Sequence, residues 1–529
     1  MNFNVTPVEA VTREFLAVVL AGFGNELLPL TSEHGEEPCP KALLPIFNKP
    51  MLDYPLSWLE QSGIKDVLLI CPSSHRAAIS HYIHSDSTTT SFASLRIDLQ
   101  PFDESQDLSS GTCSLLKHFA SRIQDDFVLL PCDFIPPPSL PLSKLLNKFR
   151  TESATDGAIA TTCWFEAQRT GSSPDEWGAS FPSPSIVWDE VTGTLLHVDV
   201  PDGTDHRGEL ELRMGLLTSY PRAKLSSKFH DSHVYVCKRA VLDVLLQKHH
   251  FDSLREDFFP WLCKIQYQNT KRIKYGHALG ALADSISNSI SMKHSTLHTN
   301  VYAKIKLTTL EPRTSESSPQ QSRIGLSMPS SPAESDIDQS ITSSLRIGVI
   351  IHRAENGFTL RANNLGSYLD VNRHFLTSTS YSLPSEPQKR ALIDQKANIS
   401  SDSAIGDFTR VEEKTSIKRS IVGSHCVIGK MVKIVGCVLL DHCVISDGAK
   451  LEGCILGKNT TVGVKAELIR CVTQAGYEVE ENGSYRNEKL DVADWAAGPE
   501  DSSSDEDDDE DEEEDEEDED EDESEESET

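Results

Sequence analysis

The sequence predicts two folded domains of different class, an α/β domain followed by a left-handed parallel β-helix of hexapeptide repeats. Two observations predict them: buried strands alternate with helices in the first half of the chain, and aliphatic residues recur at a fixed period after residue 400. At 529 residues the chain is long enough for two or three hydrophobic cores.

The α/β domain is expected over residues 15–297, after an N-terminal extension of residues 1–14. Three apolar runs are typical of buried parallel strands: Phe15–Gly22, Asp66–Cys71 and Asp126–Pro131. Two amphipathic segments are expected to be helices, Pro50–Ser62 and Leu254–Gln266. The order strand, helix, strand indicates βαβ units and therefore a parallel sheet.

Residues 308–344 separate the two domains and are rich in Ser, Pro, Thr and Gln. They hold too few apolar residues to offset the entropy of ordering, so we expect a flexible, disordered linker. An apolar pattern returns in a connecting region, residues 346–400, which leads into the repeats.

The β-helix is expected over residues 401–475, in about four coils. Aliphatic residues follow one another at steps of six, six and five, which gives a period of 17: Ile405, Val411, Ile417, Val422, Ile428, Ile434, Leu439, Ile445, Leu451, Leu456, Val462 and Leu468. Residues two apart in a strand share a face, so the position two before each aliphatic also points inward. These positions hold small residues: Ser403, Thr409, Thr415, Ser420, Cys426, Val432, Cys437, Cys443, Ala449, Cys454, Thr460 and Ala466.

A narrow three-sided interior needs this alternation, because it cannot hold two bulky residues on each side of one coil. Glycine follows five of the aliphatics, where we expect the backbone to turn a corner: Gly406, Gly423, Gly429, Gly457 and Gly463. The alternative is a chance spacing of β-branched residues in an ordinary sheet.

The 12 cysteines show neither a C-x-x-C pair nor zinc-finger spacing, and no secretory signal is visible. We therefore expect free thiols in a reducing compartment. Five cysteines fall on the repeat, and a buried structural role is favoured over a metal or redox role: Cys426, Cys437, Cys443, Cys454 and Cys471.

The net charge of −33 is concentrated in an acidic tail, residues 500–529, of which Asp501 to Thr529 contains 23 Asp and Glu and neither Lys nor Arg. Without these 23 carboxylates the chain carries only −10, which disfavours direct binding to nucleic acid through a basic surface. The tail is expected to be a disordered extension. An alternative is that it engages a basic partner and is phosphorylated, with five serines available: Ser502, Ser503, Ser504, Ser524 and Ser527. No apolar run is long enough to cross a bilayer, so no membrane span is expected.

The segment Val18–Leu59 resembles the sugar-phosphate nucleotidyltransferases, whose signature joins a glycine-rich loop to a Pro-Lys motif. It reads LAGFGNELLPLT and then PCPKALLPIFNKPMLDYPLSWL, and the second half matches the family pattern closely. In that family the loop amides and the lysine contact the nucleotide phosphates. The resemblance therefore implies a Rossmann-like nucleotide site whose candidate residues are Gly22, Gly24, Lys41, Gly111 in a Gly-Thr turn over the base, and Asp133, which resembles a metal-binding aspartate.

The glycine-rich loop departs from the family pattern at three positions. Ala21 stands where the first glycine is expected, Asn25 replaces a threonine, and Glu26 replaces the arginine that neutralises the triphosphate. A carboxylate there reverses the sign of an interaction of roughly 4 kcal/mol per charge pair at about 4 Å and an effective dielectric constant of about 20. We therefore expect a retained fold with a vestigial site, and neither a catalytic residue, a bound metal nor a cofactor.

Three later segments resemble the gamma and epsilon subunits of eukaryotic translation initiation factor two-B: DSHVYVC at 231–237, SLREDFFPWLCKIQY at 253–267 and RANNLGSYLDVNR at 361–373. The gamma class fits better, because epsilon subunits carry a long C-terminal helical-repeat domain that performs nucleotide exchange. Only a short and largely acidic segment follows the β-helix here.

The resemblance implies a non-catalytic subunit of a guanine-nucleotide exchange complex in the cytosol. Such a subunit would pair with the catalytic epsilon subunit, and the complete initiation factor two-B would convert GDP-bound initiation factor two, its G-protein substrate, into the GTP-bound form. Both domains would then serve as protein interaction surfaces, without direct contact to nucleic acid or membrane.

Two enzymatic alternatives stay open. An active sugar-1-phosphate nucleotidyltransferase, such as a mannose-1-phosphate guanylyltransferase, also joins this type of domain to a β-helix, although Glu26 disfavours it. An acyltransferase of the hexapeptide class would use a histidine on the coils. His425 and His442 lie one full period apart on one edge, which also fits a stack of surface side chains.

Overall fold

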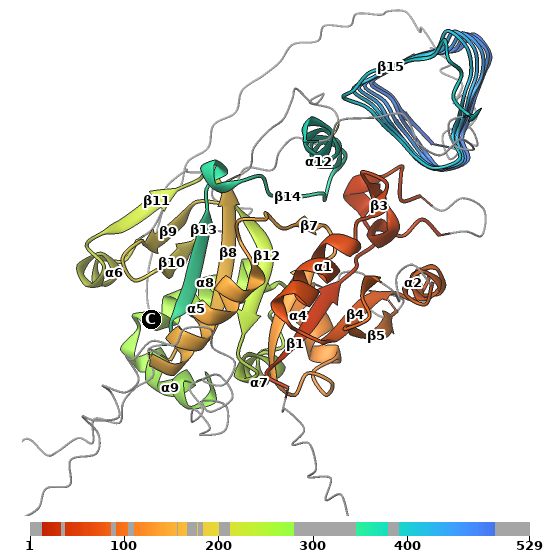
Figure 1. Ribbon diagram of the computed structural model, residues 1–529. Coiled ribbons are helices and arrows are strands. Elements are labelled where there is room, and N and C mark those ends of the chain that lie inside the picture. The colour runs from red at the N-terminus through yellow and green to blue at the C-terminus, as the bar shows by residue number, and fades with distance from the viewer. Residues whose placement is uncertain are drawn as a thin grey trace, which may run out of the picture. The chain divides into compact units, whose positions relative to one another are not determined.

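The computed structural model describes residues 13–32, 38–85, 91–103, 111–155, 157–166, 177, 184–199, 212–279, 345–378 and 391–491. The expected linker at 308–344 and the acidic tail at 500–529 lie outside these residues. The described residues up to Leu490 belong to one compact unit. Figure 1 shows the α/β part and the coil of short strands.

A ten-stranded sheet forms the centre of the α/β part, in the order β11-β9-β10-β13-β8-β12-β6-β1-β4-β5. Its parallel part contains β6 (Asp126–Pro131), β1 (Phe15–Leu20), β4 (Asp66–Pro72) and β5 (Arg96–Phe102). The three expected strands are confirmed as neighbours in this part. The remaining strands are β8 (Ala160–Glu166), β9 (Ile186–Asp189), β10 (Thr194–Val198), β11 (Ala223–Ser226), β12 (Phe229–Cys237) and β13 (Ile347–His352).

Helices cover both faces of this sheet. Successive residues of a strand point to opposite sides, and in this sheet the residues on both sides are apolar and need to be buried. In β1, Leu16 and Val18 belong to one core, whereas Ala17 and Val19 belong to the other. The first core is closed by α4 (Thr112–His118), α7 (Ala240–Gln247), α8 (Phe259–Gln266) and α9 (Asn269–Leu279). The second is closed by α1 (Asp53–Ser62), α2 (Arg76–Ile83) and α5 (Leu142–Thr155).

Both expected helices are present, and only the first starts later than expected. The first begins at Asp53, after the short strands β2 (Pro45–Ile46) and β3 (Lys49–Pro50). The second opens with a π-helical turn, η5 (Leu254–Phe258), before α8. A further short helix, α6 (Met214–Ser219), lies next to β11 in sequence.

The α/β part extends beyond the expected limit at residue 297. Strand β13, which lies in the expected connecting region, is inserted between β10 and β8 and pairs in parallel with β8. It is apolar and mostly buried. Local patterning does not show which sheet such a strand joins. Its partners, β10 and β8, precede it in the sequence and are separated from it by residues 280–344.

Three parallel sheets form the second part, and Figure 1 shows them coiling around a triangular interior. One holds β15 (Asn398–Ile399), β18 (Ser416–Lys418), β21 (Lys433–Val435), β24 (Lys450–Glu452), β27 (Glu467–Ile469) and β30 (Ser484–Arg486). The second holds β16 (Ala404–Ile405), β19 (Ile421–Val422), β22 (Val438–Leu439), β25 (Ile455–Leu456), β28 (Val472–Thr473) and β31 (Lys489–Leu490). The third holds β17 (Arg410–Val411), β20 (Val427–Ile428), β23 (Val444–Ile445), β26 (Thr461–Val462) and β29 (Glu478–Val479).

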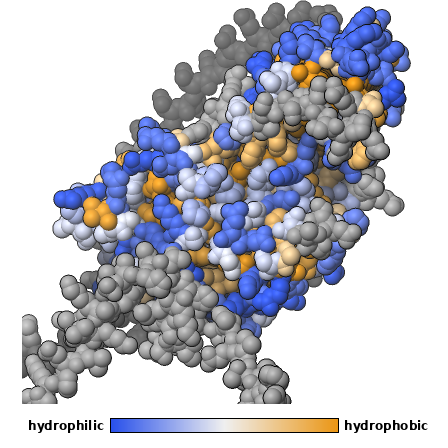
Figure 2. Space-filling view, viewed as in Figure 1, coloured by the Kyte–Doolittle hydropathy of each residue, from blue (hydrophilic) through white to orange (hydrophobic). Residues whose placement is uncertain are grey.

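The coil runs from Asn398 to Leu490 and is therefore longer than the expected 401–475. The last coil does not stand out in the repeat pattern, because Thr473 and Tyr485 occupy positions that earlier coils fill with aliphatic residues. Seen along the coil in Figure 2, hydrophilic residues predominate around the outside.

The predicted interior is confirmed. Eleven of the 12 aliphatic positions are buried and Ile405 is partly buried, while every small position two residues earlier is buried. Each strand pairs with the strand one period further along the chain, as in Ile417↔Ile434 and Ile434↔Leu451.

The corners are turned by other residues than those expected. Positive φ angles occur at Gly436 (65°), His425 (57°) and Asn459 (61°), among other corner residues, rather than at the glycines that follow the aliphatics. Those glycines allow neighbouring coils to approach closely instead: a Cβ at Gly457 would lie 2.6 Å from the carbonyl carbon of Gln474.

All 12 cysteines are free thiols. In the coil interior, the Cys454 Sγ lies 3.4 Å from the Glu452 carbonyl oxygen and 3.3 Å from that of Leu468. The Ser420 hydroxyl donates to the Lys418 carbonyl at the equivalent place, at 2.7 Å.

We therefore expect Cys454→Ser to change the free energy of unfolding by about 1 kcal/mol or less, since the new hydroxyl finds the same acceptors. Cys454→Leu is expected to cost about 1 to 3 kcal/mol, because it places a second bulky residue on one side of a coil. Urea titrations followed by far-UV circular dichroism measure both values. Equal losses in the two variants would contradict the packing rule.

Candidate functional site

A pocket of about 480 Å³ lies at the carboxyl ends of β1, β4 and β6, where parallel sheets commonly carry their sites. All five candidate residues line it: Gly22, Gly24, Lys41, Gly111 and Asp133. The structure therefore brings together side chains and loops that are far apart in the sequence, whereas their role as nucleotide contacts stays a prediction.

The glycine-rich loop follows β1 directly and leads into a short 3-10 helix, η1 (Asn25–Leu27). Gly24 has a φ of 86°, which only glycine adopts readily, and a Cβ there would lie 3.0 Å from the Cβ of Lys41. None of the backbone N–H groups from Gly22 to Glu26 donates a hydrogen bond to another described residue. Glu26 is exposed and lines the pocket, where the resemblance led us to expect an arginine.

The Gly-Thr turn at the opposite wall is held by a carboxylate. Asp252 accepts hydrogen bonds from the Gly111 N–H and the Ser114 hydroxyl, both at 2.9 Å. A Cβ at Gly111 would lie 2.4 Å from the Asp252 carbonyl oxygen, so this position requires glycine.

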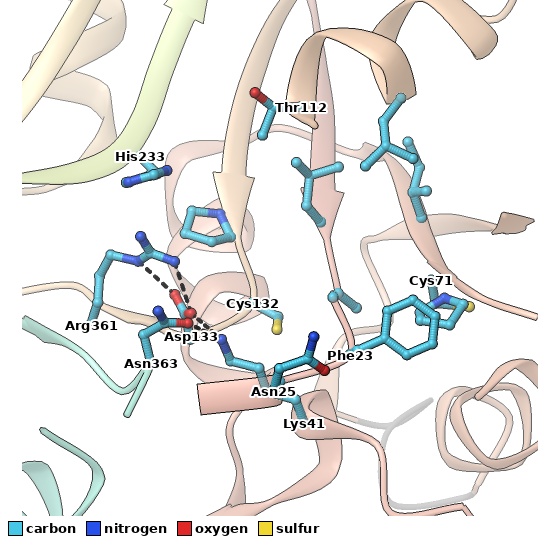
Figure 3. Close-up of a pocket in the computed structure, with 18 of the residues that line it drawn as sticks. Phe23, Asn25, Lys41, Cys71, Thr112, Cys132, Asp133, His233, Arg361 and Asn363 are labelled. Atoms are coloured by element: carbon cyan, nitrogen blue, oxygen red, sulfur yellow. Dashed lines mark hydrogen bonds and ion pairs between the residues drawn. The ribbon is translucent and has the colours of Figure 1, made fainter. Parts of the chain in front are cut away.

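Asp133 lies at the floor of the pocket in contact with two cations (Figure 3). The Arg361 guanidinium donates from Nε to Oδ1 and from Nη2 to Oδ2, each at 2.9 Å. The Lys41 Nζ lies 2.5 Å from Oδ2 of Asp133 and 2.5 Å from Oδ1 of Asn363. Side-chain exposure is 1% for Asp133, 7% for Lys41 and 19% for Arg361, so the whole cluster is largely dry.

Burial by itself would raise the pKa of Asp133, but Arg361 and Lys41 outweigh it and hold that pKa below its usual range. Asp133 is therefore ionised, and its charge is matched inside the protein.

Backbone pairing fixes Arg361 beside Asp133. The short strand β14 (Leu360–Arg361) runs antiparallel to β7 (Phe134–Ile135), which follows Asp133 in the chain. The Ala362 N–H donates to the Asp133 carbonyl oxygen at 2.9 Å, and the Thr359 hydroxyl donates to that of Ile135 at 2.7 Å.

Sequence reasoning missed Arg361 and Asn363 as pocket residues, although both stand in the segment RANNLGSYLDVNR. A signal was present, since this segment opens with polar residues before an apolar helix, α12 (Leu365–Thr377). Its place in the pocket depends on the pairing of β14 with β7 across a long stretch of chain, which local sequence does not encode.

A β-bulge directs His233 into the same pocket. The register of β12 against β8 shifts between Asp231 and Tyr235, and His233 has a φ of 55°. Burial and the nearby Arg361 lower the pKa of His233 well below its usual value, so the imidazole is neutral. The Tyr235 hydroxyl donates to Asp231, and burial raises the pKa of Tyr235 well above its usual value.

The two coil histidines are exposed, in contrast to the partly buried His233. The rings of His425 and His442 stack with centroids 5.1 Å apart on an exposed corner, next to Phe408. In the described part of the chain, no group of three or more His, Cys, Asp or Glu side chains could hold a metal ion. The described helices are all too short or too polar to cross a membrane.

Comparison with known proteins defines the class of both domains. A nucleotidyl transferase family model matches residues 16–171, and a model of the LbH domain of EIF2B subunit epsilon matches residues 387–484. The chain therefore joins a nucleotidyltransferase-type domain to a left-handed β-helix of the eIF2B type, as the sequence predicted.

Among known proteins, the chain is similar to those named translation initiation factor eIF2B subunit gamma in three organisms. In Schizosaccharomyces pombe the identity is 34% over 267 residues, which cover 50% of this chain and 55% of the relative. In Caenorhabditis elegans the identity is 29%, over 49% of this chain and 61% of the relative. In Dictyostelium discoideum the identity is 21%, over 78% of this chain and 88% of the relative. The match thus spans little more than half the length of the first two relatives. It confirms the resemblance to gamma subunits and does not favour a sugar nucleotidyltransferase.

Proposed function

We propose that this chain is a non-catalytic subunit of a guanine-nucleotide exchange complex of the eIF2B type, acting in the cytosol. In this role it pairs with a catalytic epsilon-type subunit and, with the remaining subunits, acts on initiation factor two. One observation carries the proposal: the chain is similar to eIF2B gamma subunits, and its β-helix matches the LbH domain of EIF2B subunit epsilon.

The chemistry of the pocket supports the absence of catalysis. Nucleotidyl transfer develops charge on the phosphates and needs cations aimed at it. Here the loop presents Glu26, while Lys41 and Arg361 are both bound to Asp133. The five candidate residues are accordingly proposed as remnants of a nucleotide site: Gly22, Gly24, Lys41, Gly111 and Asp133.

Purification of the chain from its native cells tests the assembly. We expect stoichiometric recovery of the other eIF2B subunits, with initiation factor two in lower amount. A mock purification from cells without the affinity tag provides the background. Recovery of the chain alone, or only with copies of itself, would contradict the proposed role.

Pyrophosphate release tests the absence of catalysis separately. The purified chain is incubated with GTP, mannose 1-phosphate and Mg²⁺, and we expect no release above the buffer blank. An active mannose-1-phosphate guanylyltransferase run in parallel shows that the assay works. Turnover that disappears in Lys41→Ala would identify this chain as an enzyme.

A further inference from the structure

The nucleotidyltransferase resemblance implies a divalent metal ion bound to Asp133, and the residues around Asp133 do not fit one. A magnesium site requires carboxylate oxygens that are free to coordinate, and it keeps several waters in near-octahedral geometry. Both oxygens of Asp133 already accept hydrogen bonds from Arg361, and Oδ2 accepts a further one from Lys41. The nearby carboxylate of Asp231 is bound to the Tyr235 hydroxyl and the backbone N–H of His233.

We propose that Arg361 is a resident cation that fills the metal position beside Asp133, so that this pocket excludes divalent metal ions. The guanidinium is planar, permanently charged and matched to a carboxylate through two parallel hydrogen bonds. It therefore satisfies Asp133 as a metal ion would, and it repels any dication that approaches.

Backbone hydrogen bonds on both sides of Arg361 fix the place of this residue beside Asp133. Strand β14 pairs with β7 directly after Asp133, and the Ala362 N–H binds the Asp133 carbonyl oxygen. Shortly after Arg361, a capping box starts α12: Asn364 accepts from the Ser367 N–H at 2.7 Å, and the Ser367 hydroxyl accepts from the Asn364 N–H at 3.1 Å. Arg361 is thus held between a paired strand and a capped helix.

The pairing of Asp133 with Arg361 also gives the pocket a structural role. Asp133, which the resemblance assigns to a metal, instead anchors Arg361 and the chain that leads from β14 into α12. The inference rests on Asp133 and the two cations bound to it, so it can fail while the proposed role in an exchange complex holds, and the reverse is equally possible.

Manganese binding to the full-length chain tests the inference, with free Mn²⁺ measured by electron paramagnetic resonance. The acidic tail is expected to bind some Mn²⁺ weakly. All variants therefore keep the same tail, so that this background is common to every titration. We expect the wild-type chain and Asp133→Asn to give superimposable titrations. Arg361→Gln is expected to gain one additional Mn²⁺ site, which the double variant Arg361→Gln with Asp133→Asn loses again.

Arg353→Gln is the matched control, because this substitution changes the charge by the same amount. Arg353 pairs with Glu190 at 3.0 Å on the surface. This control is expected to leave Mn²⁺ binding unchanged. One more Mn²⁺ site in the wild-type chain than in Asp133→Asn would overturn the proposal. So would a folded Arg361→Gln variant that gains no site.

A second measurement uses only the wild-type chain and does not depend on the folding of any variant. A metal ion bound to the native state raises the Tm by mass action. We expect the Tm of the α/β part to be the same in MgCl₂ as in NaCl of equal ionic strength. An increase specific to Mg²⁺ that saturates with concentration would overturn the proposal.

Discussion

Asp133→Asn is expected to lower the free energy of unfolding of the α/β part by about 3 to 5 kcal/mol at pH 7, the usual cost of removing one partner from a buried ion pair. The substitution leaves Lys41 and Arg361 side by side, with 7% and 19% of their side chains exposed and without the carboxylate that they share. Their mutual repulsion adds to the loss of the hydrogen bonds that Oδ2 of Asp133 accepts from Arg361 and Lys41, because asparagine has an NH2 group in place of one carboxylate oxygen.

Denaturant titrations followed by tryptophan fluorescence measure this effect. Five of the six tryptophans lie between Trp58 and Trp261, so the signal reports on the α/β part. Asp98→Asn is the matched control, because Asp98 pairs with Arg122 at 3.0 Å while half exposed. Such surface pairs contribute about 1 kcal/mol or less. Equal losses in the two variants would show that the cluster does not stabilise the fold.

The dependence on pH follows from the low pKa of Asp133. Two neighbouring cations hold its folded pKa below the unfolded value of about 3.9, so its contribution is fully present above that value. As the pH falls below about 4 towards the folded pKa, the contribution is lost. The difference in stability between the wild-type chain and Asp133→Asn is therefore expected to stay constant from about pH 5 to 8 and to shrink in stronger acid. A difference that grew with acidity would have the wrong sign.

The sequence predicted most of the coil, because each of its contacts repeats the same local rule. A single period sets the register, the inward face and the alternation of large and small side chains, as at Ile434 and Val432. The rule failed where a position carries an unusual residue, as at Tyr485, and where the backbone angle was assigned to Gly457 instead of to a corner residue.

The candidate pocket was predicted only in part, for a different physical reason. Gly22, Gly24 and Lys41 follow β1 within one stretch of chain. Asp133 comes shortly after β6, which pairs with β1, so a βαβ pattern places these residues together. Arg361 reaches Asp133 through a strand pair formed after a long intervening segment. The identity of its partner is a property of the tertiary structure, and no period or spacing carries it.

The coil makes a second large effect testable with two adjacent residues of β23. Ile445 points inward with 1% exposure and stacks on Ile428 and Val462, whereas Val444 points outward with 39% exposure. Ile445→Ala is expected to cost about 2 to 5 kcal/mol, because the narrow interior cannot collapse around the cavity. Val444→Ala is expected to cost less than about 1 kcal/mol.

Hydrogen exchange measured by mass spectrometry on peptides from the coil separates the two outcomes locally. In a repeat structure each coil contacts only its neighbours, so Ile445→Ala should speed exchange first in β20, β23 and β26 and less in the terminal coils. Exchange in β1 and β6 provides the internal reference. Because a shift of one residue in register turns every side chain to the other face, a larger effect of Val444→Ala than of Ile445→Ala would mean that the coil is built in the opposite register.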